Sequence, residues 1–333
     1  MNEVTGDRPI PSCLPLSTTG HRIPRRSPNG CSVGPVTFGL TTLSGFSWLS
    51  SRGLFSPRAC RRCNPSRLGG SASCSPAMSG LSCCCLAVLH LYLYVFRAQG
   101  ETFRYTTRSF AVGSRRFRFN HQVRDNMFHT LLSGVPVFTA YEVITYWGFA
   151  NGFLGYGSHS SASVGFWIWA VVLILLAPVI HSVHFYFGHR LLHTKLLYRR
   201  YHALHHHNIN VGPWSGLSMH PVEHIVYFST VVVQWLLALH PINALYQIQL
   251  AAFLPALSHS GFEKVMMGKD FSLDGSSYFH YLHHKHFECN YGGSLVPLDR
   301  LFGTYHDGTV EADSALRDRL RARRQALREA KAA

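Results

Sequence analysis

Long apolar runs alternate with polar segments along the chain. Three runs stand out, residues 81–96, 127–149 and 164–187, and the third carries no Asp, Glu, Lys or Arg. A helix needs about 20 apolar residues to cross the hydrocarbon core of a membrane. The third run is therefore predicted to span a membrane, and the first two are candidates for spanning helices.

A fourth apolar region, residues 225–257, is interrupted by His240-Pro241. Each of its two arms is short for a full membrane crossing. The pattern predicts a helical hairpin that packs tightly or does not cross completely.

The polar segments divide the chain into four parts. Residues 1–78 are rich in Ser, Pro, Gly and Arg and contain no acidic residue after Asp7, which indicates a disordered segment, a targeting extension or a wrongly assigned start. Residues 79–124 hold the first apolar run and a basic loop. Residues 125–310 form the membrane and histidine-rich part, and residues 311–333 alternate charges with Leu and Ala, which is typical of a surface helix.

The composition favours a membrane protein, because only 14% of the 333 residues are charged and 47% are hydrophobic. The net charge of +15 does not indicate a nucleic-acid partner, because no basic stripe interleaved with aromatic residues is present. Arginines concentrate in residues 97–126, whereas residues 151–163 hold no Lys or Arg. The positive-inside rule then places the basic loop, and the histidines after residue 187, in the cytosol.

That rule leaves the first apolar run ambiguous. If residues 81–96 spanned the membrane, the basic N-terminal segment and the basic loop would lie on opposite sides. The run is therefore an unfavourable span, part of a cleaved targeting signal or an interfacial helix. Eight of the nine cysteines precede residue 86, so a disulfide framework is not expected, and the single Cys60-x-x-Cys63 pair lacks a second pair at zinc spacing.

Sixteen of the 22 histidines lie between His181 and His286, and three motifs organise them. HRLLH spaces two histidines four apart, and HALHH and HYLHH each space three at i, i+3 and i+4, which places each set on one face of a helix. The motif histidines are His189, His193, His202, His205, His206, His280, His283 and His284. Any one of them alone suits a polar residue at a membrane interface, but three spaced clusters favour metal binding.

Eight imidazoles exceed the four ligands of one tetrahedral zinc, so the motifs predict two metal ions. Imidazole binds zinc, copper, iron and nickel, and the ligand type alone leaves the element open. His259 in LSHSGF is a candidate ninth ligand. His220, Glu223 and His224 in HPVEH fit either a structural turn or the support of the ligands.

The three motifs resemble those of the membrane-bound fatty acid hydroxylase superfamily, which includes sterol C-5 desaturases and sterol C-4 methyl oxidases. The connecting segments GPWSGLSMHPVEH, HFECNYG and LDRLFGT strengthen the resemblance, which covers residues 125–310. It implies an all-α integral membrane protein whose transmembrane helices and hydrophobic hairpin are capped by a cytosolic, histidine-rich, helical metal-binding domain.

The resemblance also implies a function in lipid or sterol biosynthesis at the endoplasmic reticulum. Two iron ions would be held by the eight motif histidines, with His259 as a further ligand, while His220, His224, Glu223, Glu288, Asn290 and Asp299 orient ligands or maintain the fold. The enzyme would be an oxidoreductase that acts on paired donors, using dioxygen and two electrons to desaturate or hydroxylate a sterol or, as second choice, a fatty acyl lipid. Redox-inactive zinc does not suit such chemistry.

Electrons are expected from a separate cytochrome b5 or NAD(P)H-dependent reductase, because no fused haem domain is recognisable. The sequence leaves open the oligomeric state, the regiochemistry and the choice between desaturation and hydroxylation. Two alternatives remain: a histidine-rich membrane metal transporter, which is disfavoured because the motifs lie beside rather than within the apolar runs, and a catalytically inactive family member that serves as a partner protein.

Overall fold

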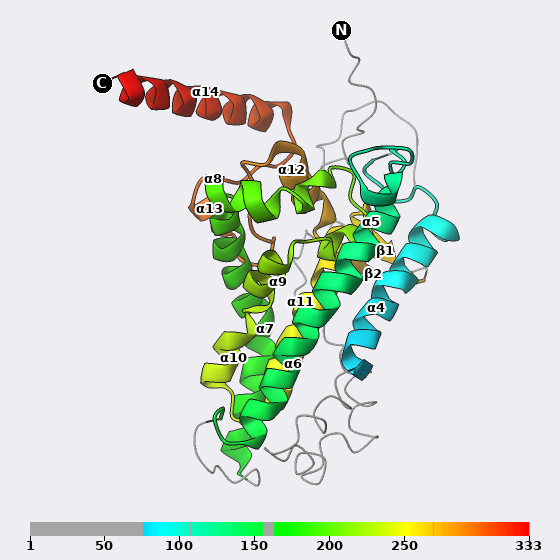
Figure 1. The fold of residues 1–333 in the computed structure, drawn as a ribbon, viewed down its shortest axis with the longest axis vertical. Helices are drawn as coiled ribbons and strands as arrows, with labels where there is room; N and C mark the ends of the chain where they lie inside the picture. Colours follow the sequence, from blue (N-terminus) through cyan, green and yellow to red (C-terminus); the bar gives the residue numbers. More distant parts are fainter. Residues whose placement is uncertain (1–75, 107, 156–162, 269, 333) are drawn as a thin grey trace, which may run out of the picture.

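The structure is a computed structural model that describes residues 76–106, 108–155, 163–268 and 270–332 (Figure 1). The predicted N-terminal extension, residues 1–78, falls outside the described residues except for its last three positions, and so does the Cys60-x-x-Cys63 pair.

Helices make up most of the described chain. They are α4 (Pro76–His90), α5 (Gln122–His129), α6 (Val135–Ala150), α7 (Val164–Leu192), α8 (Lys195–Leu197), α9 (Pro221–Phe228), α10 (Val231–Leu237), α11 (Pro241–Ser258), α12 (Ser277–His286), α13 (Leu298–Leu301) and α14 (Val310–Ala332). Figure 1 shows α4, α6, α7 and α11 along the long axis, with α8, α12 and α13 at one end, from which α14 extends sideways.

Short turns of other helical types connect these elements. The π-helical turns are η1 (Leu91–Val95), η3 (Thr130–Gly134) and η4 (Tyr198–His202), and the 3₁₀ turns are η2 (Arg118–Asn120), η5 (His205–His207) and η6 (Pro213–Leu217). Because η3 joins α5 to α6 without a break, residues Gln122–Ala150 form one continuous helix.

Among the residues that the structure describes, two helices are long and apolar enough to cross a membrane, namely Gln122–Ala150 and α7. They contain the second and third predicted runs. Ser163 caps α7 by accepting a hydrogen bond from the amide of Phe166, and large apolar side chains such as Ile168 and Leu175 are exposed on its outer face. The first run forms a shorter apolar helix, Gly80–Val95.

The predicted hairpin turns at His240-Pro241, where α11 begins. Pro241 occupies the first turn of α11 and His240 caps it, its ring accepting a hydrogen bond from the amide of Ile242, an arrangement that suits proline and a capping side chain. The first arm is itself divided into α9 and α10. Helix α11 is the central element, since it packs against α4, α6, α7 and α10 and most of its residues are buried.

The described fold is mostly helical, as the all-α expectation requires, and adds one short pair of strands. Strands β1 (Lys264–Met266) and β2 (Ser272–Asp274) pair antiparallel between α11 and α12. Val265 lies opposite Leu273 in this register, and both side chains are buried in the main core. The paired strands therefore satisfy their backbone groups locally while they cover the core.

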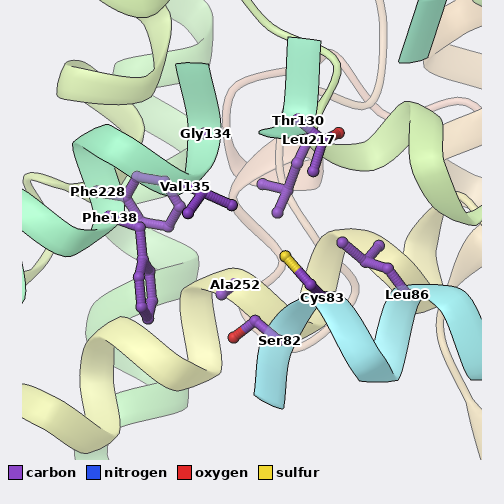
Figure 2. A pocket seen from close by; sticks show the side chains of 10 residues that line it. All are labelled: Ser82, Cys83, Leu86, Thr130, Gly134, Val135, Phe138, Leu217, Phe228 and Ala252. Carbon is purple, nitrogen blue, oxygen red and sulfur yellow. The ribbon is translucent and has the colours of Figure 1, made fainter. Parts of the chain in front are cut away.

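A small cavity lies between α4 and the helices packed against it (Figure 2). Its wall includes Leu86 of α4, Phe138 of α6, Leu217 of η6 and Phe228 of α9. The cavity measures about 10 Å³, room for about one water molecule. The core beside α4 is thus closely packed.

Candidate metal centre

The histidine motifs meet at the end of the molecule where α7 finishes. HRLLH forms the last turn of α7 and HYLHH lies on α12, while HALHH covers the end of η4 and the start of η5. His259 follows α11 directly. All eight motif histidines and His259 come together, although His193 remains partly exposed.

The nine histidines divide into two groups, and within each group the potential ligand atoms lie within 4.8 Å of one another. The first histidine group consists of His189, His193, His202, His206 and His283. The second histidine group consists of His205, His259, His280 and His284.

The two groups do not follow the three motifs. The i, i+4 partners stay together, whereas His205 and His283, at i+3, each join the other group. On α12 all three rings of HYLHH are buried, so one face of this helix serves both groups. HALHH is not a regular α-helix, because His202 ends a π-helical turn and His205 starts a 3₁₀ turn.

The Nε2 atoms of the first group lie very close together. At such distances two lone pairs repel each other unless a proton or a cation lies between them. The Nε2 of His202 lies 3.1 Å from those of His189 and His193 and 3.0 Å from that of His206, and the Nε2 atoms of His193 and His283 are 3.0 Å apart. A neutral imidazole carries one proton, so the partner of each Nδ1 determines what Nε2 presents.

Three Nδ1 atoms of this group face oxygen atoms. The Nδ1 of His189 lies 2.6 Å from the carbonyl oxygen of Tyr291, and the Nδ1 of His283 lies 2.6 Å from that of Cys289. The Nδ1 of His202 lies 2.7 Å from Oε1 of Glu223. A carbonyl oxygen can only accept, so the Nδ1 atoms of His189 and His283 must donate, which leaves a bare lone pair on each of their Nε2 atoms for a cation to bind.

The second group repeats this arrangement. The Nε2 of His259 lies 3.1 Å from that of His284 and 3.3 Å from that of His205. Its Nδ1 faces the carbonyl oxygen of Pro255 at 3.1 Å, and Nδ1 of His205 faces that of Ser218 at 3.4 Å. Two further ring nitrogens of this group, Nε2 of His280 and Nδ1 of His284, are buried and have no hydrogen-bond partner in the described structure.

These separations suit metal coordination. Two nitrogens bound to one metal at ~2.1 Å lie ~3.0 to 3.4 Å apart at common coordination angles. Burial also keeps the rings in the neutral form that binds metals. It lowers the pKa of His193 to about 2, with the neighbouring His189 as a further cause, and the pKa of His259 to about 3. Burial is likewise the largest cause that lowers the pKa well below the ordinary value for His202, His205, His206, His280, His283 and His284.

Glu223 is the predicted supporting residue that touches a histidine of the groups directly. It sits in the first turn of α9, fully buried, and burial raises the pKa of its carboxyl group. Its hydrogen bond fixes the His202 ring with Nε2 turned toward the group.

Replacing Glu223 by Gln is expected to weaken metal binding about 10- to 100-fold, the usual consequence of losing such a supporting carboxylate. Titration of the metal-free protein with Fe²⁺ or Zn²⁺ measures this change. Glu311→Gln, the same substitution at an exposed position of α14, is the control. Equal affinities of the Glu223 and Glu311 variants would contradict the role assigned to Glu223.

The loop after α12 positions two further rings through its backbone. Asp299 is buried and its carboxylate accepts hydrogen bonds from the amides of Tyr291 (2.9 Å) and Gly292 (2.8 Å) and from Oγ1 of Thr304 (2.6 Å). The Asn290 side chain bridges the carbonyl oxygens of Phe279 and His306. Both residues thus hold the segment whose carbonyl groups orient His189 and His283.

The other three predicted supporting residues bond elsewhere. The ring of His220 caps α9 by accepting from the amide of Val222, and Glu288 accepts hydrogen bonds from Tyr291 and Arg323 near the surface. His224 bonds to Ser133 and to the carbonyl oxygen of Leu217. It therefore supports the backbone beside Ser218 rather than a ligand ring.

A third cluster, which the sequence did not reveal, joins His286, His306 and Asp313. Both rings present Nε2 to Oδ1 of Asp313, at 3.3 and 3.1 Å. The Nδ1 of His306 accepts a hydrogen bond from the amide of Gly308, so its proton resides on Nε2 and is donated to Asp313. The cluster is thus a hydrogen-bonded attachment of α14, and residues so far apart in sequence carry no spacing signal.

Comparison with known proteins agrees with the geometry. Residues 174–304 match the profile of the fatty acid hydroxylase family, which confirms the resemblance predicted from the motifs. No solved structure matches the chain.

Three curated relatives illustrate the similarity. A very-long-chain aldehyde decarbonylase of Oryza sativa subsp. indica is 32% identical over 156 residues, covering 45% of this chain and 59% of that protein. A Delta(7)-sterol-C5(6)-desaturase of Nicotiana tabacum is 34% identical over 152 residues, covering 44% and 54%. A methylsterol monooxygenase of Arabidopsis thaliana is 30% identical over 157 residues, covering 46% and 59%. The chain therefore spans less than two thirds of the length of these relatives.

Proposed function

We propose that the protein is a membrane-bound oxidoreductase that desaturates or hydroxylates a lipid with two bound iron ions, dioxygen and external electrons. The match of residues 174–304 to the fatty acid hydroxylase family supports this proposal. The observation that carries the proposal is the convergence of nine histidine side chains into two groups, in each of which the potential ligand atoms lie within 4.8 Å of one another. Bound iron would supply the redox chemistry that oxidation of an unactivated C–H bond requires, which zinc lacks.

The protein's own residues would hold and orient this centre. The nine histidines are the ligands in this proposal, and Glu223 with the carbonyl groups of Cys289 and Tyr291 fixes three of the rings. Eight of the nine histidines are buried, and their surroundings keep bulk water away from the ligand atoms. The Nδ1 atoms of His189 and His283 donate to backbone carbonyl groups, so these two ligands would keep that proton when metal binds to Nε2.

The length of α7 supports a position just outside the bilayer. Its 29 residues extend about 43 Å, whereas the hydrocarbon core is about 30 Å thick. In this proposal α7 enters the hydrocarbon near Val164, so that His189, in the last turn of α7, lies beyond it. The arginine-rich segment 97–126 precedes the helix Gln122–Ala150 and overlaps its first turn, so the positive-inside rule favours a cytosolic centre. The resemblance to sterol desaturases supports the proposal that the membrane is that of the endoplasmic reticulum.

The relatives support two substrate classes. Two of the three named above act on sterols by their names, which favours a sterol, and the decarbonylase supports a long-chain acyl lipid as the second choice.

A basic surface supports the proposed electron partner, a separate cytochrome b5 or reductase. Lys195, Arg199 and Arg200 are exposed around Tyr198, whose ring lies 5.5 to 6.0 Å from the rings of three histidines of the first group. Such a cationic patch suits an acidic electron-transfer protein.

The experiment that tests the function combines elemental analysis with lipidomics on the full chain expressed in a eukaryotic membrane host. Two irons per chain, together with an oxidised sterol or acyl lipid absent from the empty-vector strain, are expected. Zinc without any lipid change, after anaerobic purification and reloading with Fe²⁺, would contradict the proposal and favour a metal transporter or an inactive family member.

A further inference from the structure

A second cavity lies on the side of α4 that faces the basic loop. It measures about 330 Å³, within the usual range of ligand sites, and is lined by the end of α4, η1, residues 97–104 and 109–112, and the start of α5. One wall is apolar and includes Leu93, Tyr94 and Phe110. The lining also includes Arg97 and Arg104, whose guanidinium group lies 5.7 Å from the centre of the Tyr94 ring, so the cavity is amphipathic.

The cavity lies where apolar surface gives way to charge. Val88, Val95 and Phe96 are exposed along α4 and just beyond it, and Arg97 follows them immediately. Exposed apolar side chains followed by arginine mark the boundary between hydrocarbon and headgroups. The cavity therefore opens at the level of lipid phosphates.

Its polar wall has capacity to bind an anion. Glu101 holds Arg104 through two bonds to one guanidinium nitrogen, 2.9 and 3.1 Å long, and Arg97 is exposed, so the two arginines exceed the one carboxylate by a single positive charge. Nδ1 of His90 also lines this region, buried and without a hydrogen-bond partner in the described structure. An anionic oxygen would satisfy both features.

The apolar wall contacts the segment that carries the second histidine group. The Tyr94 hydroxyl donates to the carbonyl oxygen of Ser260 at 2.7 Å, next to His259. The Tyr94 and Phe110 rings lie 4.6 Å apart, and Phe110 packs over Gly212, where a side chain would collide with it. A ligand in the cavity would thus touch the wall behind the metal centre.

We propose that this cavity binds the headgroup of an anionic membrane phospholipid, with the phosphate near Arg97 and His90 and the first methylene groups against Leu93 and Phe110. The ligand is a structural lipid at the cytosolic interface and not the substrate. The inference rests on the membrane orientation given under the proposed function, but it does not require turnover.

Photo-crosslinking tests the site. The full chain is reconstituted into phosphatidylcholine vesicles that contain a minor fraction of phosphatidylserine. This phosphatidylserine carries a diazirine on one acyl chain, close to the glycerol ester, and labelled peptides are mapped by mass spectrometry. We expect labelling within residues 88–112 that unlabelled phosphatidylserine displaces. In Arg97→Glu we expect about tenfold less labelling of this segment, and about tenfold more unlabelled phosphatidylserine needed to displace the probe. This is the effect of one lost charge-assisted contact. Arg115→Glu, the same charge reversal on an exposed residue of the same loop, should leave both unchanged.

Three outcomes would overturn the proposal. They are labelling spread evenly over the lipid-facing helices, an equal loss in the Arg97 and Arg115 variants, and displacement by inorganic phosphate as effectively as by phosphatidylserine, which would indicate a free-anion site. Because labelling is read without substrate or electrons, specific labelling together with absent lipid oxidation would leave the cavity assignment standing and refute only the proposed function.

Discussion

Replacing either His205 or His206 by alanine is expected to lower lipid oxidation at least 100-fold. The two residues are neighbours in the chain but belong to different histidine groups. Each variant removes an imidazole ring. The Nε2 of His206 lies 3.0 Å from that of His202, and the Nε2 of His205 lies 3.3 Å from that of His259. Loss of a ligand should cost more than the 10- to 100-fold typical of supporting residues.

His207 supplies a matched control, because it is the third histidine of the same 3₁₀ turn and belongs to neither group. His207→Ala should keep full activity and metal content. Product formation and metal per chain are measured for the three variants after each has been shown to insert and to elute as a single species. Full activity in the His205 or His206 variant, or equal losses in all three, would refute the assignment of the groups.

The sequence predicts the architecture of this centre well because its signals are local. Apolar runs identify the helices around residues 127–149 and 164–187, and His240-Pro241 marks the turn of the hairpin, since a proline favours the first turn of a helix. The motif spacing likewise reveals the eight histidines, because ligands on a helix recur at i+3 and i+4.

The division into two groups is not encoded locally. His283 joins the histidines of α7 and η4 although its motif partners His280 and His284 do not, and this depends on how α12 packs against the other elements. The role of the Cys289 and Tyr291 carbonyl groups cannot be predicted from the sequence, because every residue has a backbone carbonyl oxygen. Only the tertiary structure shows that they orient His283 and His189.

The replacement of Asp299 by alanine is expected to destabilise the protein by about 3 to 5 kcal/mol. Its buried carboxylate accepts from two backbone amides and from one hydroxyl group, and the truncation leaves all three donors without their acceptor. Asp318→Ala, on the exposed face of α14, removes a carboxylate without burying any donor and should change stability by less than about 1 kcal/mol.

The consequence extends from the fold to the metal centre, since the amide of Tyr291 is held by Asp299 while its carbonyl group holds His189. Thermal unfolding in detergent should therefore show a lower transition for the Asp299 variant, and metal content measured well below that transition should also fall. Asp299→Asn keeps the shape but places an amide donor against a backbone donor, so it should recover only part of the loss. If the Asp299→Ala and Asp318→Ala variants unfolded at the same temperature and bound the same metal, the loop would not position His189, and the ring would have to be held by the metal and the packing of α7 alone.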